Sequence, residues 1–176
     1  AGGCICCSYG SDLVEALQAL RRRNGIDHVV IETSGVALPG MVASALTLIE
    51  GYALAGITVV ADATLVRNQA GDRYLADTID RQLAAADLVL LNKADLAGAA
   101  LAGTADWLGT RTPSAQVVTT RQCAVPIDLV LAVRPRPTAP AGLRSTGAID
   151  AAGLYDSLTL VPDGPVDIGA LGQQLS

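Results

Sequence analysis

The run from Val29 to Gly35, with the sequence Val-Val-Ile-Glu-Thr-Ser-Gly, constrains the fold more than any other stretch of this chain. A short apolar run of β-branched residues is typical of a parallel strand buried on both faces. Ligands of open α/β sheets bind beyond the carboxyl ends of such strands. The stretch therefore predicts a central buried strand that presents Glu32 where a metal-bound phosphate could be held. Gly35 would let a backbone amide approach that phosphate. The alternative is an ordinary polar turn at the end of a strand.

Strand and helix patterns alternate along the first three quarters of the chain. Crossovers of this length predict a mostly parallel α/β sheet with flanking helices and right-handed connections. Asp12 is expected to cap the first helix, and Gly25 is expected to stop it. The predicted strands cover residues 29–31, 57–62, 87–91 and 116–120, and the predicted helices cover residues 13–20, 39–48, 74–86, 99–108 and 126–132.

The pattern changes after residue 133. Residues 134–150 contain Pro135, Pro137 and Pro140 with little hydrophobic patterning, as in an extended linker. Residues 151–176 begin with an alternating strand pattern followed by a helix pattern, so we expect the start of a small α+β domain there. The chain starts with Ala1, and Met41 is its only methionine. We interpret it as a fragment of a longer protein.

Composition and charge exclude several classes of protein. The sequence is 51% hydrophobic but only 3% aromatic, so the core must be built from small and aliphatic side chains. A net charge of -5 and a pI of about 4.6 leave no basic field to attract nucleic acid or an anionic membrane surface. The sequence shows neither a run of apolar residues long enough to span a membrane nor a signal peptide. We therefore expect a soluble, cytoplasmic protein.

The third predicted strand ends in Asn92-Lys93-Ala94-Asp95. At the carboxyl edge of a parallel sheet, Asp95 can accept hydrogen bonds from the N1 and exocyclic amino groups of guanine, a donor pair that adenine lacks. Asn92 would brace a neighbouring loop and reach the base, and the stem of Lys93 would lie along the face of the base. The alternative is a polar turn in which Asp95 caps a helix.

Cys4, Cys6 and Cys7 fall within four residues, whereas Cys123 lies far away. Such a cluster favours metal binding over a disulfide framework. Three thiolates leave one position of tetrahedral Zn²⁺ open, which fits a transferable metal better than a structural one. A redox pair of Cys4 and Cys7 is the alternative. Cys123 is expected to be a small buried thiol, and His28 an ordinary half-buried ring.

Taken together, the Cys-x-Cys-Cys, Glu-Thr-Ser-Gly and Asn-Lys-x-Asp motifs resemble the CobW-type family. These are P-loop metal-chaperone GTPases related to the urease- and hydrogenase-maturation GTPases. The likeness also includes Gln82, Ala86-Asp87, the segment 127–129 and Pro165-Val166-Asp167. The resemblance implies a partial GTPase domain over residues 1–133 and the start of the family's C-terminal domain over residues 151–176.

The resemblance also implies ligands, partners and roles. The cofactors would be GTP or GDP with Mg²⁺, and the cargo would be Zn²⁺, or Co²⁺ in cobalamin-linked members. Cys4, Cys6 and Cys7 would hold the metal for a client metalloprotein. Glu32 would act near Mg²⁺ or the attacking water, Gly35 near the γ-phosphate. Asn92, Lys93 and Asp95 would bind guanine.

The chain departs from the family pattern in three ways. Lys93 is the only lysine, so the family's phosphate loop is absent and unaided GTP hydrolysis is not expected. Leu38 stands where the family commonly has Asp after Glu-Thr-Ser-Gly, and no histidine-rich stretch follows residue 133. A non-enzymatic metal-binding remnant is therefore a second interpretation, and a redox or structural α/β domain is a third. An unpaired sheet edge would also let the chain pair with itself.

Overall fold

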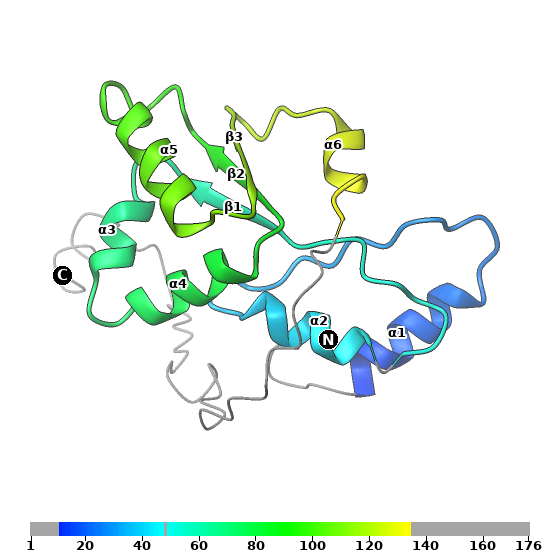
Figure 1. The fold of residues 1–176 in the computed structure, drawn as a ribbon. Coiled ribbons are helices and arrows are strands. Elements are labelled where there is room, and N and C mark those ends of the chain that lie inside the picture. The colour runs from blue at the N-terminus through cyan, green and yellow to red at the C-terminus, as the bar shows by residue number, and fades with distance from the viewer. Residues whose placement is uncertain (1–10, 48, 135–176) are drawn as a thin grey trace, which may run out of the picture.

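The structure, a computed structural model, describes residues 11–47 and 49–134 (Figure 1). It contains three strands, β1 (Thr58–Asp62), β2 (Leu88–Asn92) and β3 (Gln116–Thr119). The helices are α1 (Ser11–Arg21), α2 (Pro39–Leu46), α3 (Val66–Gly71), α4 (Ala76–Ala85), α5 (Ala100–Arg111) and α6 (Ile127–Leu131). The predictions for Cys4, Cys6 and Cys7, for most of the linker and for the second domain lie outside the described residues.

The described strands form one parallel sheet in the order β1-β2-β3. Val60 of β1 aligns with Leu90 of β2, which aligns with Val118 of β3. α3 and α4 connect β1 to β2, and α5 connects β2 to β3, so each parallel pair has a helical crossover. The structure thus confirms the predicted α/β class with a parallel sheet and flanking helices.

The main core surrounds β2, the middle strand. Its residues from Leu88 to Leu91 are all buried, because β2 has a neighbour on each side and helices over its faces. Leu83 of α4 and Leu108 of α5 pack in the same cluster as Val89. The continuous apolar run of β2 is what a fully covered parallel strand requires, and the prediction for residues 87–91 is confirmed to within a residue at each end.

β1 is less buried than the sequence predicts. Ala61 is its only buried residue, and Val60 is 56% exposed. Among the described residues, β1 pairs with β2 alone, so its other edge has no strand partner. The expected buried strand is therefore an edge strand in this structure.

The prediction of a central buried strand at residues 29–31 is wrong for the described part of the chain. Val30 is 76% exposed, and the segment is extended but pairs with no described strand. Val29 and Ile31 instead pack against a second cluster built from Leu13 and Leu17 of α1 and Val42 of α2, among others. Alternate residues of an extended chain point to opposite sides, so Val30 points away from this cluster. Figure 1 shows α1 and α2 together below the sheet.

Several helix boundaries also differ from the predictions; α5, for example, ends at Arg111 and not at Leu108. α1 begins at Ser11, so Asp12 lies in the first turn instead of capping the helix. The residues before α4 form a turn, in which an Asp72 carboxylate oxygen accepts hydrogen bonds from the Tyr74 and Leu75 backbone amides at 2.8 and 3.1 Å. This turn separates α4 from α3, a helix that the sequence did not predict.

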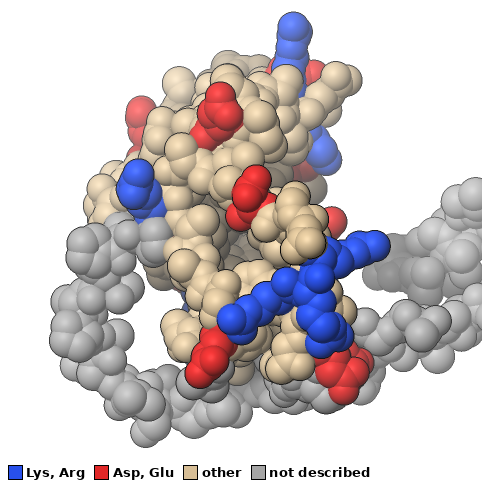
Figure 2. Space-filling view, turned by 90° about the vertical axis from the view of Figure 1, so that its right-hand side faces the viewer, with Lys and Arg blue, Asp and Glu red and all other residues tan. Residues whose placement is uncertain are grey.

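The described surface carries both signs of charge. On the face shown in Figure 2, basic side chains gather in the lower half, and acidic side chains lie beside them. Among the described helices, none combines the length and hydrophobicity needed to cross a bilayer.

Candidate functional site

Backbone hydrogen bonds join the three loops that follow the strands at the carboxyl edge of the sheet. The Ala63 amide, just after β1, donates to the Asn92 carbonyl at 2.8 Å. The Ala94 amide, just after β2, donates to the Thr120 carbonyl at 3.1 Å, and Thr120 donates to Leu91 at 2.9 Å. The three loops therefore form one connected surface, as expected where parallel strands end together.

The Asn92 side chain holds the loop after β3. Its Oδ1 accepts a hydrogen bond from the Cys123 backbone amide at 2.9 Å, and both Gln122 and Cys123 have a φ of 51°. Side chains other than glycine rarely adopt this left-handed conformation, so the loop is held in a strained shape by such contacts. The bracing role predicted for Asn92 is present in the structure, while its contact with a base remains a prediction.

Lys93 forms an ion pair with Asp62 across the ends of β2 and β1. Lys93 Nζ lies 2.7 Å from Asp62 Oδ2, and Lys93 itself has a φ of 59°. The other carboxylate oxygen of Asp62 accepts from the Thr64 hydroxyl at 2.6 Å and the Thr64 amide at 2.8 Å. The hydrogen bonds from Lys93 and Thr64 lower the pKa of Asp62 from 3.8 to about 2. The same ion pair raises the pKa of Lys93.

These contacts predict how acid affects the stability of the domain. Because the folded pKa of Asp62 lies below its ordinary value of 3.8, its stabilisation is complete above that value and is lost as the pH falls toward about 2. We expect Asp62→Asn to cost about 1 kcal/mol of unfolding free energy at pH 7, since Lys93 is half exposed and solvent screens the pair. The difference from wild type should shrink toward pH 2. Urea unfolding at several pH values measures it, with the exposed Asp106→Asn as the charge-matched control. A constant difference between pH 2 and pH 7 would contradict the assignment.

Asp95 is exposed, and within the described residues its carboxylate accepts no hydrogen bond. It does not cap a helix, because α5 begins only at Ala100. The alternative of a helix-capping turn is therefore wrong, and Asp95 is a free acceptor at the loop surface that Asn92 and Lys93 build. A carboxylate in this position fits a ligand that offers a pair of donors.

A second loop carries Glu32 and Gly35. Glu32 is exposed, and a Cβ added at Gly35 would meet nothing within 4 Å, so the backbone there faces open space. The Gln82 side-chain amide of α4 donates to the carbonyls of both Gly35 and Ala37, each at 2.9 Å. Gln82 thus fixes the position of this loop relative to α4.

The contacts of Gln82 give a second prediction. Gln82→Leu removes both donors while keeping a side chain of similar size. The two carbonyls can turn to water because the loop is at the surface, so we expect a modest loss of about 1 kcal/mol in stability. Amide hydrogen exchange of residues 33–37 should quicken by about tenfold, relative to the control Gln69→Leu in α3. Unchanged exchange in residues 33–37 would show that Gln82 does not hold this loop.

The structure does not agree with two further predictions about single residues. Cys123 and His28 are both exposed, so their predicted burial is wrong. Among residues 11–47 and 49–134, no three His, Cys, Asp or Glu side chains gather as a metal site. The sequence interpretation missed the Asp62–Lys93 pair and the strained loop at Cys123. The Asp62–Lys93 pair could have been suspected, because Asp62 lies at the end of a predicted strand.

Comparison with known proteins finds several relatives of this chain. The chain is 33% identical over 138 residues to a zinc chaperone CobW of Sinorhizobium sp, covering 62% of this chain and 38% of that protein. It is 35% identical over 101 residues to zinc-regulated GTPase metalloprotein activator 1 of Schizosaccharomyces pombe, covering 54% and 24%. A zinc chaperone YjiA of Escherichia coli is 34% identical over 107 residues, covering 56% and 33%. The chain therefore spans well under half the length of each of these relatives.

No solved structure matches the chain. Residues 1–119, however, match the family model for the nucleotide-binding domain of CobW, HypB and UreG. This match includes all three motifs, the Glu32–Gly35 loop and the loops after β1 and β2, while the loop after β3 follows the matched range. The chain belongs to the CobW/HypB/UreG family through this nucleotide-binding domain.

Proposed function

We propose that this chain is the guanine-binding and metal-carrying part of a GTP-dependent metal chaperone. One observation carries the proposal: the hydrogen bond from the Cys123 amide to Asn92 ties the loop after β3 to the end of β2. Asp95, three residues after Asn92, has a carboxylate with no hydrogen-bond partner among the described residues. The relatives named as zinc chaperones and as a GTPase metalloprotein activator support zinc as the cargo.

Guanine would bind through Asp95, Asn92 and Lys93. Asp95 accepts hydrogen bonds from the N1 and amino groups, which adenine cannot supply. Lys93 is held by its ion pair with Asp62, so its stem has a defined position beside the base. Asn92 bonds the loop after β3 and reaches the base with its remaining polar atoms.

The phosphate end of the nucleotide would lie at the second loop. Gly35 offers an open backbone there, and Glu32 supplies one hard oxygen ligand for Mg²⁺ or an acceptor for the attacking water. Mg²⁺ would neutralise the phosphate charge when bound. The chain holds no phosphate loop, since Lys93 is its only lysine, so we expect binding of GTP without hydrolysis by this chain alone.

The metal would bind at Cys4, Cys6 and Cys7, which lie outside the described residues. Zn²⁺ suits three thiolates and an open fourth position, from which a client metalloprotein could take it. Co²⁺ would be the alternative cargo. The proposed compartment is the cytoplasm, where thiols stay reduced. The edge of β1 that pairs with no described strand is where two copies of the chain would pair.

The two sites would be coupled by the Glu32–Gly35 loop. We propose that this loop takes different positions with GTP and GDP, that Gln82 carries the difference to α4, and that the cysteine loop responds. The test is the zinc affinity of the reduced chain in millimolar GTP, GDP or ATP. After correction for the zinc that each nucleotide chelates, we expect at least about a fivefold difference in affinity between GTP and GDP and no effect of ATP.

Two outcomes would contradict this coupling. Zinc affinity that is the same in GTP, GDP and no nucleotide would favour the second candidate, a metal-binding remnant without nucleotide control. That candidate draws its support from the absent phosphate-loop lysine. An equal response to ATP and GTP after that correction would show that the coupling does not depend on recognition of guanine.

A further inference from the structure

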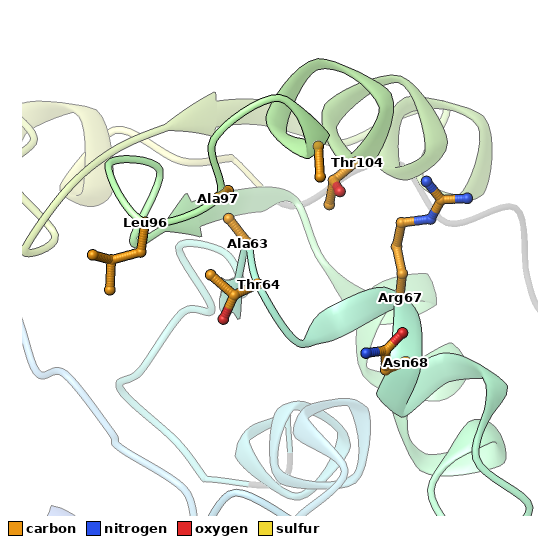
Figure 3. A pocket seen from close by; sticks show the side chains of 8 residues that line it. Ala63, Thr64, Arg67, Asn68, Leu96, Ala97 and Thr104 are labelled. Carbon is orange, nitrogen blue, oxygen red and sulfur yellow. The ribbon is translucent and has the colours of Figure 1, made fainter.

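A cavity of about 540 Å³ opens beside the carboxyl ends of β1 and β2 (Figure 3). Its volume lies within the range of small-molecule sites. α3 forms one wall, α5 another, and the loop after β2 the third. The lining residues are Ala63, Thr64, Arg67, Asn68, Leu96, Ala97, Ala100 and Thr104. None of the residues proposed to bind guanine or phosphate lines it.

Thr104 places an unpaired hydroxyl in the wall of this cavity. The residue is only 2% exposed, and within the described residues its hydroxyl makes no hydrogen bond. A buried polar group without a partner costs about 1–3 kcal/mol, so such groups normally face water or a ligand. Figure 3 shows the Thr104 side chain projecting from α5 on the cavity side.

Arg67 brings a cation to the same wall. It makes no ion pair among the described residues, whereas Arg81 and Arg111 pair with Asp77 and Asp80. Its guanidinium reaches across to α5, because Nη1 would lie 3.8 Å from a Cβ added at Gly103. Figure 3 shows the guanidinium extended from α3 toward the helix that carries Thr104.

The polar groups of the cavity are mainly donors. The Arg67 guanidinium, the Asn68 amide and the Thr104 hydroxyl can all donate, and no Asp or Glu lines the cavity. The remaining surface comes from Leu96, which is 68% exposed, from alanines, and from Thr64, whose hydroxyl already donates to Asp62. Donors at one side and apolar carbon at the other fit a ligand with an oxyanion and a compact apolar body.

We infer that this cavity binds a small molecule carrying a phosphate or carboxylate group on an apolar body, with the oxyanion at Arg67 and Thr104. The site is separate from the proposed guanine site, so it stands whether or not the chain binds GTP. The two kinds of oxyanion share the same donors, and only their geometry and charge differ.

The test is a titration of the isotope-labelled chain with phenyl phosphate and benzoate, followed by amide NMR shifts. Inorganic phosphate tests the oxyanion without the apolar body, and phenol tests the apolar body without the oxyanion. We expect saturable shifts at residues 63–68 and 96–104, with phenyl phosphate or benzoate binding at least about fivefold more tightly than either partial probe. Arg67→Gln should weaken binding by about tenfold and the isosteric Thr104→Val by about threefold. The control Arg73→Gln, whose guanidinium lies on the Tyr74 ring, should change nothing.

The relative affinities of phenyl phosphate and benzoate identify the preferred oxyanion as phosphate or carboxylate. Equal weakening by Arg67→Gln and Arg73→Gln would show that the probes respond only to net charge. Shifts confined to residues outside the cavity, or no saturable shift with either probe, would overturn the inference. Guanosine should not compete, and competition by guanosine would mean that the cavity belongs to the nucleotide site.

Discussion

Replacing Asp95 with Asn is expected to change the base preference of the chain from guanine to xanthine. In the proposed site, the carboxylate of Asp95 would accept two hydrogen bonds from guanine donors, each worth about 1.5 kcal/mol when one partner is charged. An asparagine offers one acceptor and one donor, which matches the N1–H and the C2 carbonyl of xanthine. We therefore expect guanosine affinity to fall by about 100-fold and xanthosine to become the better ligand.

The measurement is a titration of both variants with guanosine, xanthosine and adenosine, monitored by amide shifts of residues 92–95 and 120–123. Asp106→Asn makes the same change of charge at an exposed position of α5 and should leave the preference for guanosine intact. An Asp95→Asn variant that keeps the wild-type preference would show that Asp95 does not contact the base.

Replacing Cys4, Cys6 and Cys7 together with Ser is expected to abolish tight zinc binding. Removing a single residue that hydrogen-bonds to a metal ligand already lowers the metal affinity by about 10–100-fold. Loss of all three thiolates should lower it by at least about 1,000-fold, because serine hydroxyls stay protonated and bind zinc poorly. Competition with a chelating dye under reducing conditions measures the difference.

Cys123→Ser is the matched control for this experiment. Cys123 is exposed and lies in the loop after β3, so its replacement should leave the zinc affinity unchanged. Equal affinity of wild type and the triple variant would reject the cysteine cluster as the metal site. A Cys4–Cys7 disulfide that forms reversibly and excludes zinc would support the redox interpretation instead.

The middle of the fold could be predicted from the sequence because its signals are local. β2 is a continuous apolar run that ends in polar residues, and this pattern has few structural solutions. The Asn-Lys-x-Asp motif directly follows it, so its place at the carboxyl edge followed from the position of the strand alone. The hydrogen bond from Cys123 to Asn92 could not be predicted in the same way, because it joins residues 31 positions apart in the sequence.

The strand expected at residues 29–31 shows the limit of such reasoning. An apolar run indicates which residues are suited to a sheet, but a strand also needs a partner to accept its hydrogen bonds. Val30 points away from the cluster that Val29 and Ile31 contact, and it pairs with no described strand. Val60 lies in a strand at the edge of the described sheet and is also exposed. Burial of these residues depends on a neighbour that their own sequence does not encode.

The short helix α3 and the cavity beside it also could not be predicted from the sequence. α3 has six residues, too few to show the repeat that identifies a longer helix. Arg67 and Thr104 come from different helices, and nothing in their sequence context indicates that they line one cavity. Only the arrangement of α3, α5 and the loop after β2 around the cavity brings them together.

A titration of the wild-type chain with guanosine and adenosine, read from its amide NMR spectrum, tests the central claim most directly. Nucleosides carry no phosphate, so the result does not depend on a phosphate loop. The proposed function predicts saturable shifts at residues 92–95 and 120–123 with guanosine, and at least about tenfold weaker binding of adenosine. Equal binding of the two nucleosides, or the absence of shifts in these loops with guanosine, would contradict it.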